Sequence, residues 1–385
     1  MKHTALLATL GALVANEAID WGIPVREALL KAGMKDIPTA EEWKHIPWWG
    51  PIDNVVRDSL VHDICLNGPG RDIVVDRSGI RSILPLALHR DWIIWLQNKL
   101  LVNRMGPKED PTTWGNLSHE KRLGVARGGT GLRRLRYTAT REGLTPDGPS
   151  LTLRILPDEF ASLDDLVAAH VLPKDVAEIL RRAILTKHVN IIISGGTGSG
   201  KTTLAAALKR EMGEMRCVVV QDIPELPTGD PFNDVGFVLE DGDEFAFLEA
   251  VRLALRLNIE RVILGEGRGA ELWAMIQAAS TGHPILTTLH ATNGIEVFLR
   301  MESYAAAARH TTPAIVRANL SALDVIVVHM DSDTTKQRRV TQVVELRRGS
   351  SSTPGDPYEC AIVREFRNGR LTMIEPIRSE WAKER

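Results

Sequence analysis

The run GGTGSGKTT, from Gly195 to Thr203, constrains the fold of this chain more than any other feature of the sequence. It matches the pattern GxxxxGK[ST], in which glycines let successive backbone N–H groups turn toward one anion. A β-rich run, NIIIS, precedes it, and a helix-forming run, TLAAALKREM, follows it. A glycine-rich loop between a strand and the N-terminus of a helix is a ready site for phosphate. We therefore expect a nucleotide-binding domain built around this loop.

The residue types within the loop indicate how a nucleotide would be held. Backbone N–H groups cradle the phosphates, the lysine reaches the β- and γ-phosphates, and the hydroxyl after the lysine ligates Mg²⁺. Thr202 is therefore the expected metal ligand within the loop. The expected nucleotide contacts are Gly195, Gly196, Thr197, Gly198, Ser199, Gly200, Lys201, Thr202 and Thr203.

Apolar runs on both sides of the loop predict an α/β domain. NIIISG, CVVVQD, RVILGE, ILTTLHA and DVIVVHM are rich in Val, Ile and Leu and show little polar alternation. Such strands are buried on both faces, which is typical of a largely parallel sheet covered by helices. From Val340 onward, VTQVVELR, ECAIVREF and RLTMIEPI resemble antiparallel strands, with GSSSTPGDP expected to form a loop.

The chain before the loop has a different pattern. HDICLNGPGRDIVVDRSG predicts two strands joined by an Asn-Gly-Pro-Gly turn, residues 89–105 predict a helix, and LRRLRYTATRE and SLTLRIL predict two more strands. The expected domains are an N-terminal appendage (1–54), an α+β domain (55–156), a linker with two helices broken near Pro173 (157–187), a P-loop domain (188–330) and a C-terminal β-rich extension (331–385).

Composition narrows the functional classes. The 385 residues fit about two domains, and the formal net charge of −2 disfavours capture of nucleic acid or an anionic membrane by the whole chain. Cys65, Cys217 and Cys360 form no CxxC pair, which excludes a disulfide framework and fits a reducing compartment. No apolar run reaches ~18 residues. The apolar stretch Thr4–Ala15 fits a buried or interface helix, with a short signal-peptide core as the alternative.

Two further segments place carboxylates at the ends of expected strands. VILGE ends at Glu266, where a carboxylate can order the metal shell or polarise an attacking water, and Arg268 follows closely. The run QDIPE begins at Gln221, directly after the strand CVVV. Its two carboxylates, Asp222 and Glu225, are expected to face the γ-phosphate.

A fourth segment, GHPILTTLH, has His283 at one end of a strand and His290 at the other. A histidine there can sense phosphate or contact a neighbouring subunit. In this order and spacing, GGTGSGKTT, QDIPEL, VILGEGR and TGHPILTTLH resemble the Walker A, Asp, Walker B and His boxes of the hexameric secretion ATPase superfamily. The resemblance covers about residues 55–330 and includes VHDICLNGPGRDIVVDRSG and DGPSLTLR in the N-terminal domain.

The resemblance implies a RecA-like P-loop ATPase domain preceded by a smaller α+β domain, with ATP and Mg²⁺ as ligands. Members power type IV secretion and conjugation, Dot/Icm-type and type II secretion, and extension and retraction of type IV pili. A homo-oligomer, a hexameric ring, is expected on the cytoplasmic face of the inner membrane, passing force to secretion or pilus components there. The motifs resemble conjugative and Dot/Icm-type members most, while the transported substrate stays open.

The resemblance also assigns roles to arginines, which keep their charge and can bind phosphate oxygens bidentately. Arg154 in SLTLR matches an N-terminal arginine that closes over the nucleotide, with Arg136 and Arg141 as further candidates. Arg256, in ALRLNIERVILGE, matches the arginine before Walker B. The expected catalytic residues are Glu266, Asp222, Glu225, His283, His290, Arg154, Arg256 and Arg268, with Thr202 and Glu266 as metal ligands.

One residue departs from the family pattern, because Gln221 stands where the Asp box usually has Glu. If the missing carboxylate activates water, hydrolysis is slow and Gln221→Glu would accelerate it. Two alternatives to a secretion motor follow. A nucleotide-gated scaffold with little turnover is kept open by Gln221, and a DNA-translocating motor is disfavoured by the near-neutral charge and the absence of a recognised nucleic-acid module.

Overall fold

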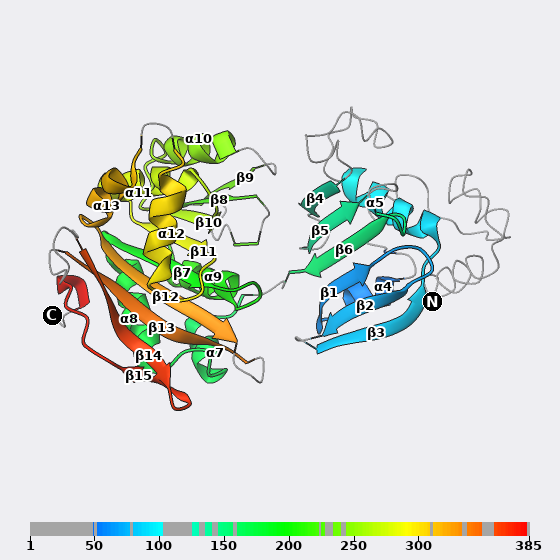
Figure 1. The fold of residues 1–385 in the computed structure, drawn as a ribbon, viewed down its shortest axis with the longest axis horizontal. Helices are drawn as coiled ribbons and strands as arrows, with labels where there is room; N and C mark the ends of the chain where they lie inside the picture. The colour runs from blue at the N-terminus through cyan, green and yellow to red at the C-terminus, as the bar shows by residue number, and fades with distance from the viewer. Residues whose placement is uncertain are drawn as a thin grey trace. The chain divides into compact units, whose positions relative to one another are not determined.

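The chain folds into two compact units, residues 1–158 and 159–385 (Figure 1). The computed structural model describes residues 49, 52–77, 80–102, 125–130, 135–140, 145–156, 160–222, 225–227, 234–239, 244–308, 311–332, 337–348 and 358–382. Thr4–Ala15, most of the appendage 1–54, Arg141 and the expected loop GSSSTPGDP lie outside these residues. No described helix is long and apolar enough to cross a bilayer.

The first unit is a six-stranded antiparallel sheet in the order β3-β2-β1-β6-β5-β4. The expected Asn-Gly-Pro-Gly turn joins the first two strands, and both its glycines, Gly68 and Gly70, have positive φ. The elements are α4 (Asp53–Arg57), β1 (Val61–Leu66), β2 (Asp72–Arg77), β3 (Ile80–Ala87), α5 (Arg90–Val102), β4 (Val125–Thr130), β5 (Leu135–Thr140) and β6 (Ser150–Ile155).

Alternation along the strands builds the core of this unit. Strand β5 buries every second residue, and helix α5 adds Trp92 to the same apolar cluster. Gln97 on α5 is buried, and its amide donates hydrogen bonds to the carbonyls of Thr140 (3.0 Å) and Ser150 (2.8 Å). The helix is thereby fixed to β5 and β6.

The second unit contains a nine-stranded sheet in the order β15-β14-β13-β12-β7-β11-β10-β8-β9. The strands from β12 to β9 pair in parallel and those from β12 to β15 pair antiparallel, which confirms the α/β prediction. The strands are β7 (Val189–Gly195), β8 (Cys217–Gln221), β9 (Val235–Val238), β10 (Arg261–Gly267), β11 (Ile285–Leu289), β12 (Asp324–Ser332), β13 (Arg338–Arg348), β14 (Tyr358–Arg367) and β15 (Arg370–Met373).

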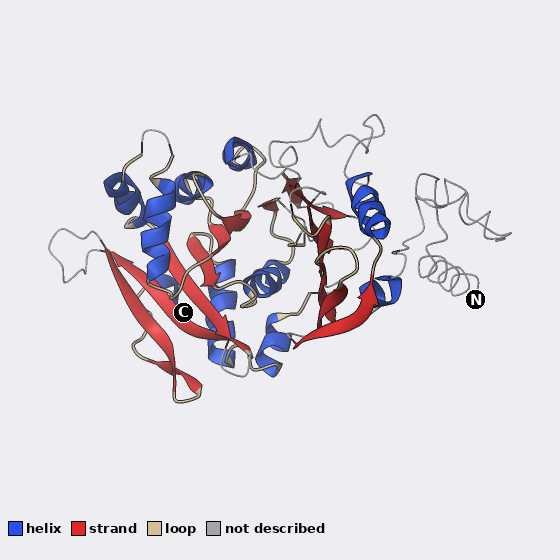
Figure 2. Ribbon diagram, turned by 45° about the vertical axis from the view of Figure 1, so that its right-hand side comes forward, coloured by secondary structure: helices blue, strands red, loops and turns tan. Residues whose placement is uncertain are grey.

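Helices cover both faces of this sheet (Figure 2). One core cluster includes α7 (Leu163–Ala168), α8 (Lys174–Leu185) and α9 (Lys201–Glu211), and the other includes α10 (Glu244–Ala254), α11 (Glu271–Ser280), α12 (Glu296–Ala305) and α13 (Pro313–Leu320). Strand β7 contributes Ile191 and Ile193 to the first cluster and Ile192 to the second. It is buried on both faces along its whole length, as its apolar run predicts.

A buried arginine anchors the edge of the sheet where the parallel strands begin. Arg261, at the start of β10, is fully buried and donates to the carbonyls of Ile184 (2.9 Å), Thr186 (3.3 Å), Val189 (3.0 Å) and Ile285 (3.2 Å). Burial lowers its pKa to about 10, so the guanidinium remains charged at neutral pH. One side chain thus ties the end of α8 to the starts of β7, β10 and β11.

Removing this guanidinium should destabilise the second unit strongly. Arg261→Leu leaves four carbonyls without their donor in a buried position, and we expect the free energy of unfolding to fall by about 3 kcal/mol or more. Urea denaturation of the full chain measures this change. Arg252→Ala is the control, because Arg252 pairs with Glu249 in an exposed position. Equal losses in the two variants would contradict the anchoring role of Arg261.

Candidate functional site

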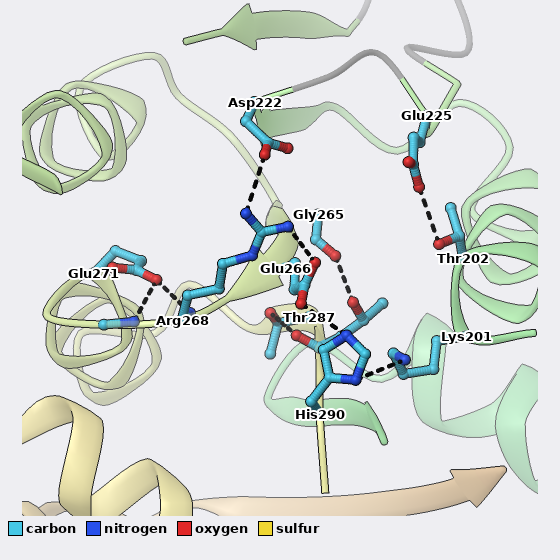
Figure 3. A network of polar contacts seen from close by, with 12 residues as sticks. Lys201, Thr202, Asp222, Glu225, Gly265, Glu266, Arg268, Glu271, Thr287 and His290 are labelled. Carbon is cyan, nitrogen blue, oxygen red and sulfur yellow. Dashed lines mark hydrogen bonds and ion pairs between the residues drawn. The ribbon is translucent and has the colours of Figure 1, made fainter. Parts of the chain in front are cut away.

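The candidate site lies at the carboxyl edge of the parallel strands. Strand β7 pairs in parallel with β11 and β12, and β10 and β8 continue the parallel sheet beyond β11. Because the strands run in one direction, the segments that follow them meet at one edge, where α/β sheets bind ligands. The loop after β7, Glu266, His290 and the turn after Gln221 therefore lie together (Figure 3).

Glycines shape the loop for two different reasons. A Cβ on Gly195 would lie 2.1 Å from the carbonyl oxygen of Met330, so the close approach to β12 requires glycine. Gly200 is the N-cap of α9, in a left-handed conformation with φ of 101°. At Gly196 and Gly198 a Cβ would meet nothing within 4 Å, so the loop borders open space that can receive phosphate.

Lys201 lies at the centre of the site. Its ammonium donates to the carbonyls of Gly195 (3.0 Å) and Gly196 (2.7 Å) and lies 3.5 Å from Nδ1 of His290. Burial lowers the pKa of Lys201, and the charge of Glu266 opposes this shift. The ammonium is therefore held between the first two glycines of the loop and His290, which follows β11.

Each carboxylate oxygen of Glu266 has a side-chain partner. Its Oε1 lies 3.0 Å from Nε2 of His290, and its Oε2 accepts a 2.6 Å bond from Arg268. Burial acts to raise the pKa of Glu266, but Arg268, His290 and Lys201 together hold it below its ordinary value. Arg268 also contacts Asp222 at 3.3 Å, which links the turns after β10 and β8 (Figure 3).

His290 bridges the lysine and the carboxylate. Burial and the charge of Lys201 lower the pKa of His290, which favours the neutral ring at pH 7. Lys201 can only donate and ionised Glu266 can only accept. The neutral tautomer that fits both therefore accepts at Nδ1 and donates from Nε2 to Glu266.

The side chains around Thr202 suit magnesium. The Thr202 hydroxyl donates a 3.3 Å hydrogen bond to Glu225, so two oxygen ligands meet at the start of α9, and Glu266 supplies another carboxylate in the site. The described residues contain no cluster of three metal-binding side chains. Mg²⁺ needs none, because it is commonly held by one or two carboxylates, water and nucleotide phosphates. The Ser199 hydroxyl is buried in the loop, and we find no hydrogen-bond partner for it among the described residues.

The Gln221 side chain hydrogen-bonds to the backbone of the segment that follows it. It is buried, its Oε1 accepts from the N–H of Leu226 (2.9 Å), and its Nε2 donates to the carbonyl of Leu226 (3.2 Å). A Cβ on Gly265 would come within 3.1 Å of the Gln221 Cβ, so glycine makes room for this side chain. The amide closes the arch that contains Asp222 and Glu225, a function that a carboxylate cannot reproduce because it has no donor.

Two of the expected site residues lie at the opposite edge of the sheet. His283 precedes β11, whereas His290 follows it, and about 20 Å of extended chain separates the two. The His283 ring lies 3.4 Å from the Thr281 hydroxyl. Arg256 is exposed between α10 and β10, before the strand that leads to Glu266. Neither joins the cluster around Lys201, because a parallel strand has its two ends at opposite edges.

Arg154 belongs to the first unit, where strand β6 presents it beside β1. Its guanidinium pairs with Asp63 through two bonds, 2.8 Å and 3.3 Å long, while about two fifths of the side chain stays exposed. Arg136 stands opposite Arg154 on β5. An acidic and two basic residues thus form one row across β1, β6 and β5.

Two supporting residues were not expected from the sequence. Buried Glu271 accepts from the backbone N–H groups of Arg268 (2.5 Å) and Gly269 (2.8 Å), which fixes the turn after Glu266. Thr288 donates a 2.6 Å bond to the carbonyl of Gly265. A glutamate at the first turn of a helix is a recognisable capping signal that would have identified Glu271. Thr288 lies within an apolar run and gives no such signal.

The pairing of Gln221 reverses the expected effect of restoring a glutamate there. Gln221→Glu should remove the bond to the Leu226 carbonyl and place a charge in a buried position, which costs about 1–3 kcal/mol. We expect a lower free energy of unfolding and no gain in the rate of phosphate release. Thermal unfolding and steady-state turnover of the same preparation measure both. A stable variant with faster turnover would show that a carboxylate is missing from the chemistry.

The chain is similar in sequence to known proteins. The family model described as "Type II/IV secretion system protein" matches residues 141–382. The conjugal transfer protein TrbB of Rhizobium radiobacter is 34% identical over 213 residues, which cover 53% of this chain and 64% of TrbB. A putative conjugal transfer protein of Mycobacterium tuberculosis strain H37Rv is 29% identical over 74% of this chain and 81% of its own length.

Solved structures share the fold. The pilus retraction motor PilT with bound ADP aligns with a TM-score of 0.54 and 22% identity, covering 81% of this chain and 82% of PilT. The ATPase DotB of Legionella pneumophila aligns with a TM-score of 0.53 and 21% identity, covering 76% of this chain and 78% of DotB. The family model matches more than half of the chain, including the loop and the strand ends that form the site; the chain therefore belongs to the type II/IV secretion system protein family.

Proposed function

We propose that this chain hydrolyses ATP with Mg²⁺ as a ring-forming motor for conjugative transfer or a related secretion or type IV pilus system. The main support is the convergence of Lys201, Thr202, Glu225, Glu266 and His290 at one edge of the sheet. These are the groups that phosphoryl transfer requires: a lysine for the phosphates, oxygen ligands for a metal and a carboxylate for the water. The conjugal transfer proteins among the relatives favour conjugation.

The chain's own residues divide the work on the triphosphate. Lys201 would exchange its longest contact, the 3.5 Å approach to His290, for an oxygen of the γ-phosphate. Glu266 would hold the attacking water by accepting a hydrogen bond from it. Arg268 and His290 keep the Glu266 carboxylate ionised and oriented. Such chemistry is mostly positioning and charge neutralisation. Lys201 is held by two backbone carbonyls of the loop, and Glu266 by the side chains of Arg268 and His290.

The metal would be held by the Thr202 hydroxyl and Glu266, with Glu225 beside them. When bound, Mg²⁺ neutralises charge that develops on the β- and γ-phosphates. The arch closed by Gln221 places Glu225 against Thr202, so its shape sets the distance between this carboxylate and the loop. Asp222, fixed by Arg268, supports the same arch from its other end.

We attribute the mechanical work of the motor to conformational change within an assembled oligomer. A P-loop leaves the outer side of the triphosphate open, and an arginine from an N-terminal domain can close it. Opening and closing around a homo-oligomer, a hexamer in the family pattern, would pass force to inner-membrane secretion or pilus components from the cytoplasmic face. His283 and Arg256, at the opposite edge of the sheet, are then available to contact a neighbouring copy.

The phosphate site is tested by two substitutions with different expected effects. Lys201→Ala removes the cation at the β- and γ-phosphates and should reduce turnover to background. Glu266→Gln keeps the shape of the side chain but lowers its ability to polarise water, so nucleotide affinity should persist while hydrolysis slows by about a hundredfold or more. Phosphate release and nucleotide affinity are measured on the full chain.

The outcomes separate the rival functions. Wild-type turnover by the Lys201 variant would refute the assignment of the site. Tight nucleotide binding without turnover in the wild type would favour a nucleotide-gated scaffold. ATPase activity that DNA stimulates and salt suppresses would favour a DNA-translocating motor.

The proposed role of Arg154 is tested in the full chain. Arg154→Ala should lower the hydrolysis rate by about 10³-fold, as expected for an arginine that stabilises developing charge, and should weaken nucleotide-induced assembly measured by sizing. Arg71→Ala is the matched control, since Arg71 makes an exposed pair with Asp147 in the same unit. An Arg154 variant with the turnover and assembly of the control would remove Arg154 from the site.

A further inference from the structure

An arginine outside the recognised motifs lies against the phosphate loop. Arg338 is the first residue of β13, and a Cβ on Gly200 would lie 3.6 Å from its Cδ and 4.0 Å from its Cβ. The Met330 methyl group would be 3.2 Å from the same position. The stems of Met330 and Arg338 therefore form a wall beside the last glycine before Lys201.

The guanidinium of Arg338 is available for a ligand. The residue is exposed, and among the described residues we find no hydrogen bond or ion pair to its side chain. Its neighbour differs, because Arg339 donates to Gln337 and its guanidinium lies 4.9 Å from the Phe366 ring centroid. Adjacent residues of a strand point to opposite faces. One arginine of the pair is thus used in packing, while the other borders the loop.

The strand order gives the loop two chemically different flanks. On one side of β7 lie β11, β10 and β8, whose ends bring His290, Glu266 and the arch with Glu225. On the other side lie β12 and β13, which bring Met330 and Arg338. A nucleotide whose γ-phosphate meets the carboxylate flank would have the β12–β13 flank on the side of its nucleoside. On such a path the phosphate next to the nucleoside would come near Arg338, which lies beside Gly200.

We propose that Arg338 is a nucleotide-binding residue that contacts the α-phosphate. This inference rests on the proposed nucleotide site and adds a specific contact to it. A guanidinium is suited to this role, because its planar donors can bind two phosphate oxygens and its charge persists at any physiological pH. The aliphatic stem lies beside Gly200, which keeps the guanidinium near the loop.

The test compares ADP with pyrophosphate by calorimetric titration of the full chain in the presence of Mg²⁺. Arg338→Ala should raise the Kd for ADP by about tenfold to a hundredfold, the effect of one hydrogen bond to a charged group. Pyrophosphate, which Lys201 and the loop can hold without Arg338, should keep its affinity. Arg338→Lys should recover part of the ADP affinity through its charge.

Arg339→Ala is the matched control, because it removes a cation from the neighbouring position on the other face of β13. It should retain wild-type affinity for ADP, with thermal unfolding reporting any loss of packing against Phe366. Unchanged ADP affinity in Arg338→Ala, or equal losses for ADP and pyrophosphate, would overturn the α-phosphate contact. A wild-type chain that binds neither ligand would instead overturn the proposed function, and the role of Arg338 with it.

Discussion

The site depends on strand β7, which lies between two parallel neighbours and ends in a residue that cannot have a side chain. At Gly195 a Cβ would lie 2.1 Å from the Met330 carbonyl oxygen of β12. The chain can leave the sheet at this point only because glycine permits the approach. The loop then reaches Gly200, and α9 begins directly afterward. Pairing with β11 on the other side brings His290 within 3.5 Å of Lys201. Close packing of β7 therefore sets both the shape of the glycine-rich loop and the position of His290 beside it.

The local parts of this arrangement could be predicted from the sequence. The loop is determined within nine residues, from Gly195 to Thr203, and apolar runs marked the buried strands around it. The order of the strands could not be predicted in this way, because it depends on pairing between segments far apart in the chain. Arg261 illustrates this limit, since an arginine before a strand resembles a surface residue. Its four carbonyl partners come from α8 and the segment after it, β7 and β11, so its role emerges only when these elements are assembled.

The positions of some site residues could be predicted from the sequence, and those of others could not. Glu266 lies near the end of β10 and His290 directly follows β11, so their meeting can be predicted once a parallel sheet is assumed. The same assumption places His283 away from the cluster around Lys201, because His283 precedes β11 and His290 follows it. Arg338 had no such signal. Arg338 lies beside the loop because β13 pairs with β12, β12 pairs with β7, and Gly200 lies close to side chains of β12 and β13. The apolar runs in the sequence do not reveal this strand order.

Gln221 shows why a departure from a family motif must be interpreted through its contacts. In a linear motif the residue counts as a lost carboxylate, yet its amide both accepts from and donates to Leu226. An ionised glutamate could not make both bonds at neutral pH, because it has no proton to donate. The arch that Gln221 closes holds Glu225 at 3.3 Å from Thr202, and Arg268 joins Asp222 to Glu266 at its other end. Gln221 therefore lacks the charge that a glutamate would carry, but its amide fixes the turn that holds Glu225 beside Thr202.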